Sequence, residues 1–121
     1  MAHRILFADD DEEDRFLTSE AFAEFGLRDE IYLLESGLKL LGYLDSIINN
    51  EQLPAVIVLD LNMPFLNGIE TLARLKSNKR FKNIPVIMKQ VGQVRVEGVG
   101  VKGGGVLFGI SIKQIVSRWR A

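Results

Sequence analysis

The chain has 121 residues, of which 47% are hydrophobic and 26% are charged, and its net charge is −1. This length supports one domain with one core. A net charge so close to zero gives no electrostatic basis for binding nucleic acid or an anionic membrane surface. The absence of cysteine excludes disulfides and thiolate chemistry. The N-terminus does not have the pattern of a signal peptide, and no apolar run approaches the length of a membrane span, so we expect a cytoplasmic protein.

Short apolar runs alternate with amphipathic segments up to residue 89. The runs predict buried strands, and the amphipathic segments predict helices that end near glycine or asparagine. The expected strands are 4–8, 30–34, 54–60 and 84–88. The expected helices are 14–26 with Leu17, Ala21 and Phe25 on the apolar face, 38–48 with Leu38, Leu41, Leu44 and Ile48, and 69–75 with Ile69, Leu72, Ala73 and Leu75.

The strand at 54–60 is apolar on both faces, which predicts a central position in a sheet that is covered by helices on each side. Strands that alternate with helices indicate a parallel sheet with right-handed crossovers. The predicted fold class is therefore α/β, and residues 1–121 are expected to form a single domain.

Six carboxylates follow the first strand in an unbroken run at residues 9–14. Such a block is usually solvated or disordered, but this one directly follows a buried strand. Acidic residues at the start of a helix interact favourably with the positive end of its dipole. We therefore expect residues 11–14 to begin the first helix, and Asp9 and Asp10 to face a cation.

Functional residues of an open parallel sheet gather at the carboxyl ends of strands, beside the point where the strand order reverses. In the order 2-1-3-4-5, strands one and three are neighbours at that point. Asp9 and Asp10 end the first strand and Asp60 ends the third, so all three should converge. Converging carboxylates repel one another unless a cation is present. Hard oxygen ligands suit Mg²⁺, which is the predicted cofactor.

At this point the sequence resembles the receiver domain of two-component response regulators. The resemblance rests on "ILFADDDEEDR" (5–15), "VIVLDLNMPFLNG" (56–68) and "IPVIM" (84–88), and it covers residues 4–89. It implies the flavodoxin-like receiver fold, a parallel sheet of order 2-1-3-4-5 with helices on both faces. It also implies that Asp60 is the phosphoacceptor, which takes its phosphoryl group from a histidine kinase or a phosphotransfer protein.

The resemblance also implies individual metal ligands. Asp10, Asp60 and the backbone carbonyl of Asn62 would bind Mg²⁺ directly, and Asp9 would act through a metal-bound water. The family has a Thr or Ser at the end of strand four, where this chain has Gln90 beside Lys89, an unusual residue for a strand. The family lysine at the end of strand five corresponds to Lys113 within a residue or so, although a solvated lysine is an equal alternative.

Residues 90–121 differ in composition from the rest of the chain. They hold seven of the eleven glycines and only one acidic residue, Glu97. The fourth helix of the family has no counterpart in residues 91–104, and Phe108 is only a loose match to its aromatic switch residue. Three interpretations remain open: a diverged fifth strand and helix, a disordered tail, or a change of reading frame after Met88.

The function predicted first is a stand-alone response regulator that signals through contact with a downstream protein or onward phosphotransfer. It is not expected to be an enzyme beyond self-phosphorylation and autodephosphorylation. The alternative is a receiver-like interaction module that works without phosphotransfer. A Mg²⁺-dependent phosphohydrolase ranks below both, because no second acidic residue follows Asp60 at near spacing. The sequence leaves dimerisation open.

Overall fold

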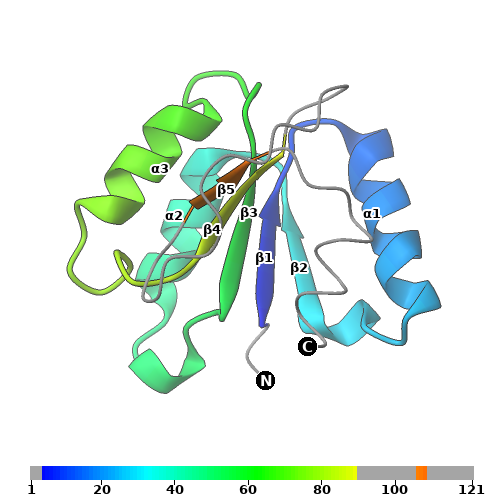
Figure 1. Cartoon of the computed structure of the whole chain (residues 1–121), viewed down its shortest axis with the longest axis horizontal. Coiled ribbons are helices and arrows are strands. Elements are labelled where there is room, and N and C mark those ends of the chain that lie inside the picture. The colour runs from blue at the N-terminus through cyan, green and yellow to red at the C-terminus, as the bar shows by residue number, and fades with distance from the viewer. Residues whose placement is uncertain (1–3, 90–105, 109–121) are drawn as a thin grey trace.

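The structure, a computed structural model, describes residues 4–89 and 106–108, which form a parallel sheet with helices on both faces (Figure 1). The strand order is β2-β1-β3-β4-β5, as the sequence predicts. The strands are β1 (Ile5–Ala8), β2 (Ile31–Leu34), β3 (Val56–Asp60), β4 (Val86–Lys89) and β5 (Val106–Phe108). The helices are α1 (Glu12–Glu24), α2 (Gly37–Ser46) and α3 (Gly68–Lys76), with 3₁₀ turns at Arg28–Glu30 and Asn50–Gln52.

The core lies on both faces of the sheet because every residue of the two central strands, β1 and β3, is buried. One apolar cluster joins the sheet to α2 and α3 through Leu40, Leu44 and Leu75, and a smaller one joins it to α1 through Phe22. Figure 1 shows α1 on one side of the sheet and α2 and α3 on the other. This confirms the predicted central position of residues 54–60.

The acidic run begins α1, as predicted. Asp11 is the N-cap, and its carboxylate accepts hydrogen bonds from the backbone N–H groups of Glu13 at 2.8 Å and Asp14 at 3.3 Å. Glu12, Glu13 and Asp14 occupy the first turn, where the helix dipole favours negative charge. The helix begins at Glu12, within the expected start at residues 11–14 and two residues before the amphipathic segment predicted at 14–26.

The predicted apolar faces of the helices were partly wrong. Four residues assigned to them are largely exposed: Leu17, Leu38, Ile48 and Ile69. Small or hydroxyl residues are buried instead, and Gly37 of α2 lies so close to α3 that a Cβ atom would collide with the Thr71 hydroxyl. Thr71 tolerates this burial because its hydroxyl donates a hydrogen bond to the carbonyl of Asn67 at 2.8 Å. The close contact between α2 and α3 therefore requires a small residue at position 37.

Part of the sequence analysis lies outside the described residues. The single-domain prediction for residues 1–121 and the interpretations of residues 90–121 remain predictions for that reason. Within that segment the structure describes β5, which pairs in parallel with β4 through Val86 and Val106. No helix in the described ranges is long and apolar enough to cross a membrane.

Candidate functional site

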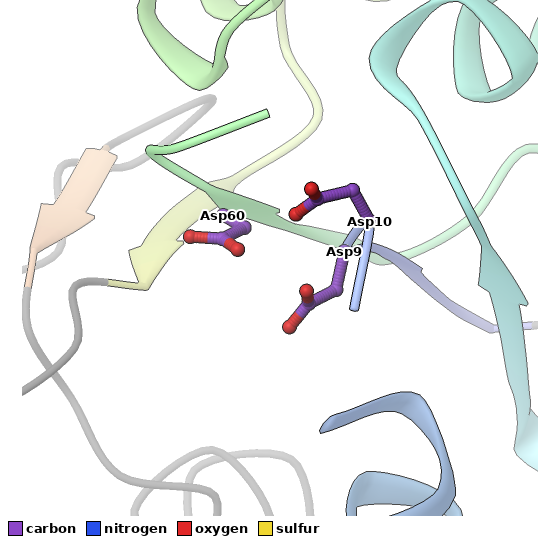
Figure 2. A group of neighbouring side chains, drawn as sticks. All are labelled: Asp9, Asp10 and Asp60. Carbon is purple, nitrogen blue, oxygen red and sulfur yellow. The ribbon is translucent and has the colours of Figure 1, made fainter. Parts of the chain in front are cut away.

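Three carboxylates converge at the carboxyl ends of β1 and β3, as the sequence predicts. Asp9, Asp10 and Asp60 each offer an oxygen atom, and these atoms lie within 4.8 Å of one another. The parallel register pairs Ala8 with Leu59, so the residues that follow reach the same level of the sheet. Figure 2 shows the three side chains gathered at the ends of the two strands. Asp9 and Asp60 are buried, whereas Asp10 is exposed and opens the cluster to solvent.

Asp9 is held in place by the start of α1. One of its carboxylate oxygens, Oδ1, accepts a hydrogen bond from the backbone N–H of Asp11 at 3.0 Å. The guanidinium of Arg15 donates to the Asp9 carbonyl at 2.8 Å. The Asp11 contact orients the fully buried Asp9 carboxylate, and the Arg15 contact holds the Asp9 backbone.

Asp60 has fewer partners. Its Oδ1 accepts one long hydrogen bond, from the backbone N–H of Asn62 at 3.3 Å. The pKa of the Asp60 carboxyl is raised to about 6, chiefly by burial and also by the neighbouring Asp9 carboxylate, against the lowering effects of the Asn62 hydrogen bond and the Lys89 ammonium. The ionised form of Asp60 is thus less favoured than that of an exposed aspartate.

Gly68 fixes the position of α3 behind this site. A Cβ atom there would collide with the Asp60 carbonyl oxygen and would lie 2.9 Å from the Leu61 Cα. The first residue of α3 therefore packs directly against the end of β3. Asn67 completes the helix start with a capping box, in which it exchanges hydrogen bonds with Glu70 at 2.8 and 3.2 Å.

The donor set fits a hard divalent cation. Three carboxylates supply only oxygen ligands, and the exposed Asp10 leaves room for the waters that Mg²⁺ retains. The pKa of Asp60, raised by burial and by the neighbouring Asp9 carboxylate, is a second sign that a positive charge would be stabilised here. The residues present therefore fit Mg²⁺.

The sequence analysis missed the role of Lys89 in this site. It is the last residue of β4 and pairs with Asp60 in the sheet register. Its ammonium donates to Oδ2 of Asp9 at 3.1 Å and lies 3.8 Å from a carboxylate oxygen of Asp14. A lysine that ends an otherwise buried strand beside an acidic pocket was the available signal.

The roles predicted for Asp9, Asp10 and Asp60 as metal ligands and phosphoacceptor remain predictions, and so do those of three other residues. Asn62 contributes a backbone N–H to Asp60, but its predicted role as a carbonyl ligand of the metal remains a prediction. Gln90 and Lys113 lie outside the described residues, so their contacts with a phosphoryl group also remain predictions.

The sequence profile of the response regulator receiver domain matches residues 5–96. The chain belongs to this family. Receiver domains are signalling domains rather than classical enzymes, and as a family they act with histidine kinases or phosphotransfer proteins and with downstream targets.

Named relatives agree with this assignment. Response regulator Rcp1 of Synechocystis sp. is 34% identical over 86 residues, which are 69% of this chain and 58% of Rcp1. The structure of a phosphorylated cyanobacterial phytochrome response regulator, RcpA, superposes with a TM-score of 0.59 at 34% identity, covering 72% of this chain and 64% of that one. The structure of a Mn²⁺-bound form of Rcp1 superposes with a TM-score of 0.59 at 33% identity, covering 69% of this chain and 62% of that one.

The matched residues span little more than half the length of two of the curated relatives. The matched share is 58% for Rcp1 and 55% for the probable methanogenesis regulatory protein FilR2 of Methanothrix harundinacea. The similarity therefore shows the family to which this receiver domain belongs. It does not extend to the activities of the full-length relatives.

Proposed function

We propose that this receiver domain is a phosphoacceptor in phosphorelay signalling. Asp60 would take its phosphoryl group from a phosphohistidine on a sensor histidine kinase or a histidine phosphotransfer protein. The observation that carries the proposal is the convergence of Asp9, Asp10 and Asp60 within 4.8 Å at the carboxyl edge of the sheet. Membership of the receiver family supports it independently.

The chemical step requires an ionised Asp60. One of its carboxylate oxygens attacks the phosphorus, the new O–P bond forms as the P–N bond breaks, and the electron pair of that bond stays on the departing imidazole nitrogen. With a pKa of about 6, the carboxyl is mostly ionised at neutral pH. Phosphoryl transfer depends on in-line positioning and charge neutralisation more than on covalent help from the protein.

We propose Asp10, Asp60 and the backbone carbonyl of Asn62 as direct ligands of Mg²⁺, with Asp9 acting through a bound water. When bound, Mg²⁺ supplies positive charge next to the phosphoryl oxygens. Gln90 takes the position of the family Thr or Ser, and its amide can donate a hydrogen bond to a phosphoryl oxygen. Lys113 is the proposed cationic contact.

The proposed output is contact with a downstream protein, because phosphorylation would change the charge and packing at this edge of the sheet. We propose that this takes place in the cytoplasm, without nucleic acid or membrane as a direct partner.

Intact mass spectrometry tests the proposal directly. The chain is incubated with Mg²⁺ and acetyl phosphate, and in parallel with a chelator and as Asp60→Asn. We expect the mass of one phosphoryl group to appear only in the unsubstituted protein with Mg²⁺. No gain in any sample, or an equal gain in Asp60→Asn, would contradict the proposal.

A second candidate is a receiver-like interaction module that works without phosphotransfer. It is favoured by the ion pair between Lys89 and Asp9, which supplies positive charge to the carboxylates from the chain itself. Mg²⁺-independent binding to a histidine kinase, together with no gain of mass from acetyl phosphate, would support this candidate over the first.

A further inference from the structure

Lys89 reaches the acidic cluster from two strands away. It ends β4, whereas Asp9 follows β1, and β3 lies between these two strands in the sheet. The Lys89 side chain lies on the α1 face, because its ammonium is 5.6 Å from the centroid of the Phe7 ring and 3.8 Å from an oxygen of Asp14 in α1. Only 19% of the side chain is exposed. The ammonium is therefore a fixed part of the site rather than a solvated surface charge.

Each of the two carboxylate oxygens of Asp9 accepts a hydrogen bond. Oδ1 accepts from the N–H of Asp11 at 3.0 Å, and Oδ2 accepts from Lys89 at 3.1 Å. Hydrogen bonds between an ammonium and a carboxylate are among the strong ones, and this pair joins a fully buried acid to a mostly buried base. A cation that recruits Asp9 must weaken this pair or share the carboxylate with it.

We propose that Lys89 is an internal counter-cation that competes with divalent metal for the carboxylate cluster and thereby sets its Mg²⁺ affinity. This inference rests on the proposed function, since it concerns the same metal site. Lys89 acts in two ways: it occupies an oxygen of Asp9, and its positive charge repels a second cation at short range. The site is thus weaker for Mg²⁺ than its three carboxylates alone would make it.

The direction of the effect separates this role from a structural one. If Lys89 merely supported the geometry of the site, its replacement would weaken metal binding. If Lys89 competes with the metal, its replacement by a neutral side chain strengthens Mg²⁺ binding. The ion pair between Lys89 and Asp9 then no longer lowers the fraction of molecules that are ready to bind Mg²⁺.

The experiment is a calorimetric Mg²⁺ titration of the full chain at fixed ionic strength. Lys89→Met removes the charge and keeps an unbranched side chain, and Lys89→Gln is a second neutral variant should the methionine protein not fold. Lys89→Arg keeps the charge. Lys82→Met is the matched control, because exposed Lys82 precedes β4 and so lies at the opposite end of that strand.

We expect the neutral variants to bind Mg²⁺ at least about tenfold more tightly than the unsubstituted protein, because a close competing charge is gone. Lys89→Arg and Lys82→Met should remain within about threefold of it. Mg²⁺ binding only by the neutral variants would be the strongest form of support.

Equal or weaker binding by both neutral variants would overturn the inference and leave the metal site intact. Absence of binding in every protein would overturn both the inference and the Mg²⁺ dependence of the proposed function. The two failures are therefore distinguishable in one set of titrations.

Discussion

The bodies of β1 and β3 and the carboxyl ends of the same strands differ in what their side chains contribute. Ile5–Ala8 and Val56–Leu59 are apolar and buried, so they stabilise the fold. One residue further on, Asp9 and Asp60 are also buried but are carboxylic acids. Burial of apolar surface lowers the free energy of the folded state, whereas burial of a charged group raises it unless that group is paired.

This difference indicates how the domain separates stability from function. The strand bodies provide the stabilisation that allows repelling carboxylates to be held together at the strand ends. Within those ends, Asp9 is paired with Lys89, whereas Asp60 has one long backbone hydrogen bond. Burial of the ionised Asp60 side chain therefore costs more free energy than burial of Asp9. Such a cost is expected of a residue that has a functional role.

The largest effect should follow from a cavity in a strand body. Leu59→Ala removes a fully buried side chain from β3 and should lower the free energy of unfolding by about 3 kcal/mol. Ile48→Ala, at a position that is 95% exposed, is the control and should change it by less than about 0.5 kcal/mol. Urea unfolding measures both, and equal losses would contradict the assignment of the core.

At the end of β3, a substitution should raise the free energy of unfolding instead of lowering it. Asp60→Asn removes a carboxylate whose pKa is raised to about 6, so in chelator at pH 7 it should stabilise the protein by about 2 kcal/mol. The folded state binds the Asp60 proton more tightly than the unfolded state. The unsubstituted protein therefore loses stability as the pH rises from about 4 through about 6, and the two proteins should converge near pH 4.

Thermal unfolding of both proteins across this pH range checks the prediction. A destabilised Asp60→Asn protein at pH 7, or a difference that is independent of pH, would show that Asp60 is not under electrostatic strain.

A polar residue at the same edge that has good partners should behave in the opposite way. Asn67→Ala removes the capping box of α3 and should destabilise the protein by about 1 kcal/mol. Asn67→Ser retains an acceptor and should recover most of that loss. Chemical denaturation of the three proteins measures this, and the prediction fails if the alanine and serine variants are equally unstable.

The smallest effect on stability should come from Asp10, the exposed member of the cluster. Asp10→Asn should change the free energy of unfolding by less than about 0.5 kcal/mol, since its side chain is in contact with solvent. The Mg²⁺ affinity of the Asp10→Asn protein should nevertheless fall at least about tenfold, because one charged ligand is lost. Calorimetric titration beside the denaturation curve tests this separation, which an unchanged affinity would refute.

The strands and the acidic edge were predictable because their signals are local. A continuous apolar run such as 56–59 predicts a buried parallel strand, and an acid at its end then lies at the carboxyl edge. The meeting of Asp9, Asp10 and Asp60 followed from the strand order alone.

The helix faces and Lys89 were not predictable in the same way, because they depend on neighbours that are distant in sequence. Gly37 and Thr71 are buried because α2 and α3 pack closely, which a count of leucines does not reveal. The pairing of Lys89 with Asp9 joins residues 80 positions apart. The spacing of hydrophobic residues predicts which face of a single helix is apolar. It does not predict contacts between elements that are distant in the sequence.

Mapping the phosphorylated residue tests the central claim most directly. After incubation with Mg²⁺ and acetyl phosphate, borohydride reduces an aspartyl phosphate to homoserine, which peptide mass spectrometry locates in the sequence. The account predicts homoserine at position 60 and at no other aspartate, with none in the chelated sample. Homoserine at Asp9 or Asp10, or at no position when Mg²⁺ is present, would contradict Asp60 as the phosphoacceptor.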